Sequence, residues 1–313
     1  MPLSIIVPSS SPVQEAALRF LYGGLPREQR EAQVAETLAA AGRNELSLQN
    51  LLMALEGERI VGAVLAMVRP GGAGFLWPPV VRAGSGAGEI SLALLESVAR
   101  RVDGQGVVFT QCLLDPDDAG GRATLDRGGF PHATDLIVLS KSLQESLPES
   151  AARGLSAVCY TEALHGQFAK VAECTYAQTL DCPALARLRG GEESLESHRA
   201  TGQFDPNAWR LYRLGDQEIG ILLLAEHPDR DTWEVTYLGV VPEARGRGYG
   251  RAILDEGLAL AKRSGRSAIE IGVDVANVPA RRLYLGRGFE EVRRFGVHLR
   301  LRSLDAATSR SHA

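Results

Sequence analysis

Apolar residues recur with two periods along the chain, and they predict strands that alternate with helices. Short apolar or alternating runs predict strands, whereas spacing of three to four residues predicts amphipathic helices. In the first half, strands are predicted at 4–7, 51–55, 60–68, 74–81, 107–114 and 136–143, and helices at 12–22, 26–42 and 89–102.

The second half repeats this order of elements. Strands are predicted at 157–161, 208–214, 217–226, 233–241 and 268–274, and helices at 163–178, 182–200, 250–264 and 278–287, before a final hairpin that ends near Arg302. The two halves therefore form one internal repeat with a period of about 160 residues. We predict a mixed α/β (α+β) protein with domains at 1–145 and 156–313, joined by a linker at 146–155 that is rich in Ser, Glu and Ala.

Composition narrows the class of protein. The 313 residues are 45% hydrophobic and 23% charged, with a net charge of -4, which is typical of a globular protein and argues against general nucleic-acid binding. No apolar run approaches the roughly 20 residues that a membrane span needs, and we expect neither a signal peptide nor a membrane partner. The four cysteines lack C-x-x-C spacing and the six histidines lack metal-ligand spacing, so we predict a cytoplasmic protein with reduced thiols and no metal.

A glycine-rich loop, Arg245–Arg251, follows the predicted strand that ends at Val241 and precedes a predicted helix. Its glycines let the backbone approach a ligand, and the helix start offers free N–H groups and the positive end of the helix dipole. This combination is typical of a pyrophosphate site, to which the arginines add positive charge; a basic surface loop is the alternative. The loop matches neither the Walker pattern nor G-x-G-x-x-G, because Arg251 follows Gly250.

The loop does match Arg-x-x-Gly-x-Gly, through Arg245, Gly248 and Gly250. A second block follows at residues 277–289, with Asn277, Ala280, Tyr284 and then Gly288-Phe289. The two blocks together resemble the GNAT superfamily of N-acetyltransferases. The resemblance implies two tandem GNAT domains, each a twisted mixed, mostly antiparallel sheet flanked by helices. This doubled plan is similar to that of the mycothiol synthases, whose acceptor is an amino-sugar-bearing thiol precursor.

The first half keeps remnants of both blocks. Gly86 and Gly88 align with Gly248 and Gly250, but Ala83 stands where Arg245 stands. The second block keeps Gly129-Phe130, while Leu125 stands at the position of Tyr284 and Asp118 at that of Asn277. Since Leu cannot donate a proton, we expect the first half to lack catalysis. Its glycines either still bind CoA or form a simple turn.

The resemblance implies transfer of an acetyl group from acetyl-CoA to an amine by direct attack. Tyr284 would protonate the leaving thiolate, and Glu234 would accept a proton from the amine through water, with Asp231 and Glu270 as alternatives. An aromatic core residue and a solvated acid are the competing interpretations of Tyr284 and Glu234. Strand alternation predicts that Glu234, Thr236, Leu238 and Val240 share one face, opposite Trp233, Val235 and Tyr237.

The remaining implied contacts are with the cofactor arm and its phosphates. They involve the backbone of Leu238, Gly239, Val240 and Val241, which should separate from the neighbouring strand, the loop residues Arg245, Gly246, Arg247, Gly248, Tyr249, Gly250 and Arg251, and Asn277.

The acceptor is less defined. The run Gly190–His198 contains Glu192, Glu193 and Glu196, which would either attract a cationic amine or form a solvated helix face. A small-molecule amine, bound by a monomer or homodimer, is the leading expectation. The alternatives are acetylation of a protein N-terminus or lysine, and a CoA-binding sensor or scaffold without turnover.

Overall fold

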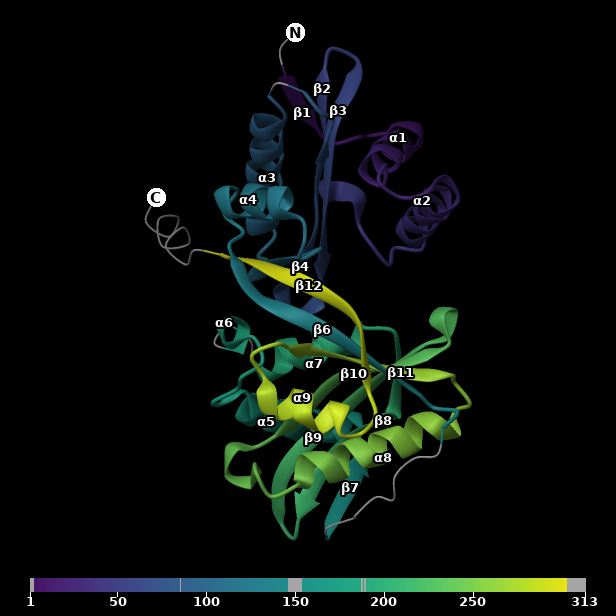
Figure 1. The fold of residues 1–313 in the computed structure, drawn as a ribbon, viewed down its shortest axis with the longest axis vertical. Helices are drawn as coiled ribbons and strands as arrows, with labels where there is room; N and C mark the ends of the chain where they lie inside the picture. Colours follow the sequence, from purple (N-terminus) through teal and green to yellow (C-terminus); the bar gives the residue numbers. More distant parts are fainter. Residues whose placement is uncertain (1–2, 85, 146–153, 187, 189, 303–313) are drawn as a thin grey trace. The chain divides into compact units, whose positions relative to one another are not determined.

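The computed structural model describes residues 3–84, 86–145, 154–186, 188 and 190–302. The chain forms two compact units (Figure 1). Unit 1 comprises Met1–Ala133 with Gly296–Ala313, and unit 2 comprises Thr134–Phe295. Within the described residues, no helix is both long and apolar enough to cross a membrane.

Unit 1 is built on a sheet with strand order β1-β2-β3-β4-β5-β12. Its elements are β1 (Leu3–Ile6), α1 (Ser11–Leu21), α2 (Arg27–Gly42), β2 (Leu51–Glu56), β3 (Arg59–Arg69), β4 (Ala73–Val81), α3 (Ala87–Gly104), β5 (Phe109–Leu114) and α4 (Ala119–Arg127).

Unit 2 has the equivalent strand order, β7-β8-β9-β10-β11-β6. Its elements are β7 (Leu155–Cys159), α5 (His165–Tyr176), α6 (Pro183–Ala186), α7 (Gly191–Arg199), β8 (Gln203–Leu214), β9 (Gln217–His227), β10 (Thr232–Val240), α8 (Tyr249–Arg263), β11 (Ala268–Asp274) and α9 (Val278–Leu285). The mixed α/β class and the repeat are confirmed: in each unit the pairing is antiparallel except for one parallel pair, β4–β5 or β10–β11.

The last strand of each half of the chain completes the sheet formed mainly by the other half. Strand β6 (His132–Ser142) pairs antiparallel with β11, and β12 (Glu290–Leu301) pairs antiparallel with β5 through Gly296–Leu301. The predicted final hairpin is wrong, because β12 continues straight into its ladder with β5 instead of turning back. The predicted division near residue 145 follows chain order. The contacts instead place β6 from Thr134 onward in unit 2 and β12 from Gly296 onward in unit 1.

Helices cover both faces of the unit 2 sheet. Ile253, Leu254 and Leu258 of α8 pack in one core cluster with Leu222 and Leu224 of β9. On the other face, α5 and α7 form a second cluster with the intervening β9 residues; its members include Phe168, Val171, Leu195, Ile221 and Leu223. Burial on the two faces alternates along β9 because successive side chains of a strand point in opposite directions.

Strand β10 breaks this alternation at a bulge. Its register with β9 shifts between Val235 and Tyr237. Beyond the shift, Leu238 and Val240 pack in the α8-side cluster with Val235, whereas Tyr237 packs in the α5-side cluster. The predicted faces of Leu238, Val240 and Tyr237 are therefore wrong, because one extra residue at a bulge reverses the phase of the strand that follows.

Candidate active site

A cavity of about 520 Å³ lies in unit 2, where β10 and β11 separate. The two strands pair in parallel only from Thr232 to Val235 and from Ala268 to Ile271. Beyond that point, residues 236–240 and 272–273 line the cavity. The separation that the sequence analysis expected at 238–241 is therefore present, and it leaves one edge of each strand facing the cavity.

The glycine-rich loop forms one wall of this cavity. Gly246 and Gly248 adopt positive φ angles of 73° and 83°, a conformation that glycine adopts without strain. Gly248 is the N-cap of α8, so the first N–H groups of that helix start at the cavity. Of the predicted loop residues, Gly246, Gly248, Tyr249, Gly250 and Arg251 line the cavity together with Arg245. Arg247 lines a neighbouring groove, and Val241 lines that groove as well.

Arg245 fixes the loop through three backbone carbonyls. Its guanidinium donates to Val240 O at 2.9 Å, to Gln178 O at 3.1 Å and to Thr175 O at 2.7 Å. These bonds connect the end of β10 to the end of α5 and to the segment after it. Arg245 is predicted to contact phosphate; three of its five N–H groups bond to backbone, and the side chain also lines the cavity. Arg251 is a cation of the loop at the cavity without these bonds.

Helix α9 brings the second predicted block to the same cavity. Asn277 Oδ1 accepts the Ala280 N–H at 3.3 Å, so Asn277 caps the helix as the sequence predicted. Two turns along, Tyr284 lines the cavity while only 5% of its surface is exposed. Burial raises the pKa of Tyr284 above its ordinary value, and the nearby negative charge of Asp181 raises it further. The phenol therefore stays protonated at neutral pH and is able to donate.

The segment after α5 supplies an acid that the sequence analysis missed. Asp181 is the one acidic residue among the described residues that line the cavity. Its Oδ1 accepts the Asp274 N–H at 3.0 Å, and Asp274 Oδ2 accepts the Cys182 N–H at 3.0 Å. These bonds hold the segment against the end of β11. No periodic pattern marks Asp181, because it lies between two helices and meets β11 only through the tertiary fold.

Tyr237 is a third tyrosine at the cavity, beside Tyr249 and Tyr284. Its hydroxyl lies 2.5 Å from Thr175 Oγ1, and its ring lies 5.6 Å from that of Tyr176. Burial raises the pKa of Tyr237, and the neighbouring Tyr176 adds to the rise. The cavity therefore has a phenol on both the α9 side and the α5 side.

Glu234 does not line the cavity. Its Oε2 lies 2.8 Å from His227 Nε2 and 4.0 Å from Arg230 Nη2. The two alternative bases are also engaged elsewhere: Asp231 lies 3.5 Å from Arg266, and Glu270 lies 2.8 Å from Arg293. Glu234 is next to the cavity in sequence, because Val235 and Thr236 line it.

The acidic run on α7 lies outside the cavity lining. Glu192 Oε2 is 2.6 Å from His165 Nε2, and no residue from 190 to 198 lines the cavity. This arrangement fits the solvated-face interpretation. Across the described part of the chain, no group of three or more His, Cys, Asp or Glu side chains is placed to hold a metal ion.

Known proteins resemble the chain in sequence and in fold. The "Acetyltransferase (GNAT) family" model matches residues 182–289. A mycothiol acetyltransferase of Beutenbergia cavernae is 36% identical over 101 residues, which cover 32% of this chain and 34% of that protein. The chain thus spans about a third of the length of this curated relative.

Two solved structures match nearly the whole chain. A GCN5-related N-acetyltransferase from Sphaerobacter thermophilus has a TM-score of 0.65 at 18% identity, covering 96% of this chain and 95% of its own. A tandem GNAT protein from the clavulanic acid biosynthesis pathway has a TM-score of 0.54 at 14% identity, covering 96% and 99%. Residues 182–289 are therefore similar to the GNAT acetyltransferase family, within a chain that has the tandem GNAT fold.

Proposed function

We propose that the protein is an N-acetyltransferase that transfers the acetyl group of acetyl-CoA to a primary amine of a small molecule. The observation that carries the proposal is the cavity of unit 2. One cavity is bordered by two separating strands, by a helix start with positive-φ glycines, and by a protonated tyrosine.

Acetyl-CoA fits this lining as the acyl donor. The N–H groups at the start of α8 and the guanidinium of Arg251 suit a pyrophosphate. The backbone of Leu238, Gly239 and Val240 suits the pantetheine arm, because amide groups at a separated strand edge are able to pair with a ligand. Acetyl-CoA supplies an activated thioester carbonyl, which the amine attacks directly.

Tyr284 is the proposed acid. Its raised pKa keeps the proton on the phenol until the thiolate departs, and α9 holds the ring at the cavity. Asn277 contributes by capping α9, which fixes the start of the helix that carries Tyr284.

Glu234 is the proposed base. An alkyl amine is mostly protonated at neutral pH, so a positioned group must remove a proton before attack. Glu234 precedes the cavity-lining residues of β10 and is a third exposed, which allows it to act through water. Asp181 is a second candidate, because it lines the cavity directly.

A small-molecule acceptor is favoured by the relatives named mycothiol acetyltransferase. We propose an amine of that chemical class, an amino-sugar-bearing thiol precursor. Acetylation of a protein N-terminus or lysine is the second candidate, and a CoA-binding scaffold without turnover is the third.

The test measures CoA release from acetyl-CoA by the full chain with three acceptors: the unacetylated mycothiol precursor, glucosamine, and a lysine-containing peptide. Turnover with the first or second supports the proposal. Turnover with the peptide alone favours the protein-directed alternative, whereas tight acetyl-CoA binding without turnover favours the scaffold.

Two substitutions distinguish Glu234 from Asp181 as the general base. We expect Glu234→Gln to lower kcat by about 10²–10⁴-fold, since it removes a proton acceptor without changing shape. Asp181→Asn should lower kcat less and should act mainly on the KM for the amine. The reverse order of effects on kcat would assign the base to Asp181.

A further inference from the structure

We propose that His227 is a positioning residue for Glu234: it fixes one oxygen of the carboxylate and so aims the other at the reacting amine or its water. The proposal rests on the proposed function, in which Glu234 is the base.

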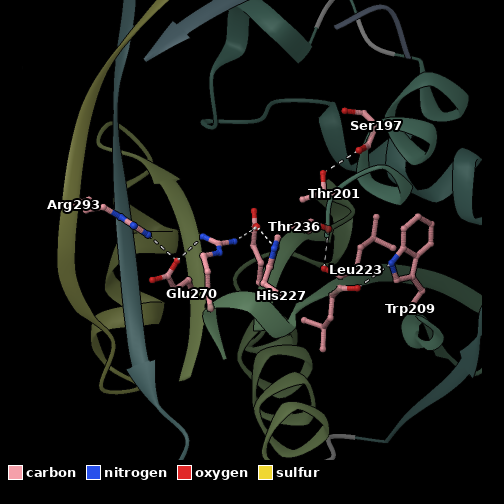
Figure 2. Close-up of polar contacts among 11 residues, drawn as sticks. Ser197, Thr201, Trp209, Leu223, His227, Thr236, Glu270 and Arg293 are labelled. Atoms are coloured by element: carbon pink, nitrogen blue, oxygen red, sulfur yellow. Dashed lines mark hydrogen bonds and ion pairs between the residues drawn. The ribbon is translucent and has the colours of Figure 1, made fainter. Parts of the chain in front are cut away.

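The two side chains meet because of strand register. His227 ends β9 and lies opposite Thr232 of β10, whereas Glu234 lies opposite Ala225. His227 and Glu234 are therefore diagonal neighbours on the same face of the sheet, a spacing that long side chains bridge. Thr236 lines the cavity beyond Glu234, and its hydroxyl donates to Leu223 O at 3.1 Å (Figure 2).

The His227 ring is held in place. Its side chain is only 13% exposed. It packs against Gly202, where a Cβ would lie 2.9 Å from His227 Cε1 and 3.0 Å from Nε2. Gly202 also has a φ of 59°, which favours glycine. Because residue 202 is glycine, the His227 imidazole has space to lie beside Glu234.

Both contacts of Glu234 use the same oxygen. His227 Nε2 is 2.8 Å from Oε2, and Arg230 Nη2 is 4.0 Å from Oε2. Among the described residues, Oε1 has no hydrogen-bond or ion-pair partner of its own, and a third of the side chain is exposed. One oxygen is therefore anchored while the other has no partner on a side chain that is a third exposed, which is the arrangement that a base acting through water requires.

The other charges around the pair do not replace His227. Arg230 is shared, because it also lies 3.8 Å from Glu270, which is paired in turn with Arg293 at 2.8 Å (Figure 2). At 4.0 Å, Arg230 contributes charge to Glu234 but no hydrogen bond. His227 is the group that donates at hydrogen-bond distance, so it sets the orientation of the carboxylate.

The test compares four full-length variants with the wild type, using acetyl-CoA and the unacetylated mycothiol precursor. His227→Leu removes the donor, and His227→Asn shortens it so that it no longer reaches Glu234. His227→Gln places an amide N–H near the position of Nε2. Glu226→Gln is the matched control, because Glu226 precedes His227 but pairs with Arg266 at 2.7 Å.

We expect His227→Leu and His227→Asn to lower kcat by about 10- to 100-fold, with the KM for acetyl-CoA unchanged within about twofold. His227→Gln should recover most of the loss, and Glu226→Gln should behave as the wild type. The Asn and Gln variants keep a polar side chain, so the comparison stands even if the Leu variant does not fold.

An unchanged kcat in His227→Asn overturns the proposal, as does a loss that His227→Gln does not recover. A similar loss in Glu226→Gln also overturns it, since that result assigns the effect to strand structure. A wild type without turnover overturns the proposed function and this inference with it, whereas an active wild type with active variants overturns this inference alone.

Discussion

The loops before α3 and α8 share a positive-φ glycine at the start of the helix, but the groups around that glycine differ. Gly86 and Gly248 are the N-caps of the two helices, with φ angles of 92° and 83°. The strands before them also match, because each parallel ladder covers four residues and ends at Leu76 or Val235. Two regions that share this ladder and this glycine cap thus provide a comparison of what surrounds them.

The strand edges show the first difference. The residues after the ladder in β4 include Pro78 and Pro79, which have no N–H to donate. The equivalent stretch of β10 contains Tyr237 and Leu238, whose backbone amides are intact. The connection to the helix is also shorter in unit 1, residues 82–85, than in unit 2, residues 241–247. The longer connection contains Arg245, which fastens the loop to three carbonyls.

The second block repeats the comparison. Asp118 caps α4 by accepting the Gly121 N–H at 2.8 Å, as Asn277 caps α9. At the position of Tyr284, however, unit 1 has Leu125, which is 1% exposed and packs in the core. Caps and glycine turns serve the fold of both units, whereas the groups suited to holding a ligand or moving a proton lie in unit 2.

The largest expected effect comes from Tyr284→Phe. Loss of the phenolic proton should lower kcat by about 10²–10⁴-fold while the Kd for acetyl-CoA stays the same. Leu125→Met is the matched change in unit 1 and should leave both values unchanged. Steady-state CoA release and titration calorimetry measure them. If the Tyr284→Phe variant keeps full kcat, Tyr284 is not the general acid, and its role is to pack against the core.

The next effect separates the two loops. Gly248→Glu forces a side chain into a positive-φ position and adds negative charge at the start of α8. We expect the affinity for acetyl-CoA to fall by about 100-fold or more, since both the backbone of the glycine-rich loop and its electrostatic potential are altered. Gly86→Glu carries the same strain in unit 1 and should leave affinity and a stoichiometry of about one unchanged in calorimetry. A second binding event that Gly86→Glu abolishes would show that unit 1 still binds CoA.

The smallest effect concerns the two caps. Asn277→Ala and Asp118→Ala should each lower the free energy of unfolding by about 0.5–2 kcal/mol, because each leaves a helix N–H without its acceptor. Urea denaturation measures both. Only Asn277→Ala should also raise the KM for acetyl-CoA, because only α9 lines the cavity. Equal effects on KM would mean that the caps act through overall stability.

Local signals were sufficient for much of this arrangement. The turn at the glycine-rich loop, the Asn277 cap and the strand at 268–274 follow from residue type and spacing, which act over a few neighbours. The bulge at Val235 to Tyr237 was missed because its sequence alternates as an ordinary strand does. One extra residue there moved Leu238 and Val240 to the face opposite the predicted one.

Contacts between segments that lie far apart in the chain could not be predicted from the sequence. The bonds from Arg245 to the carbonyls of Thr175 and Gln178, 70 and 67 positions earlier, were not predicted. Asp181 reaches the cavity through Asp274, and Glu234 finds His227 across a turn. Each of these side chains has an ordinary local pattern, and only the tertiary fold assigns its partner.

The exchange of β6 and β12 bears on how the chain is made. Strand β5 pairs with β12, which lies far later in the chain, so this edge of the unit 1 sheet stays unpaired until Gly296–Leu301 has been synthesised. Unit 2, in contrast, finds β6 already synthesised when β11 emerges. A fragment that begins after residue 145 would lack β6 and present β11 as a bare edge, which favours aggregation. Each half of the chain thus supplies a strand that the other half's sheet needs for a paired edge, even though the candidate chemistry lies in one of them.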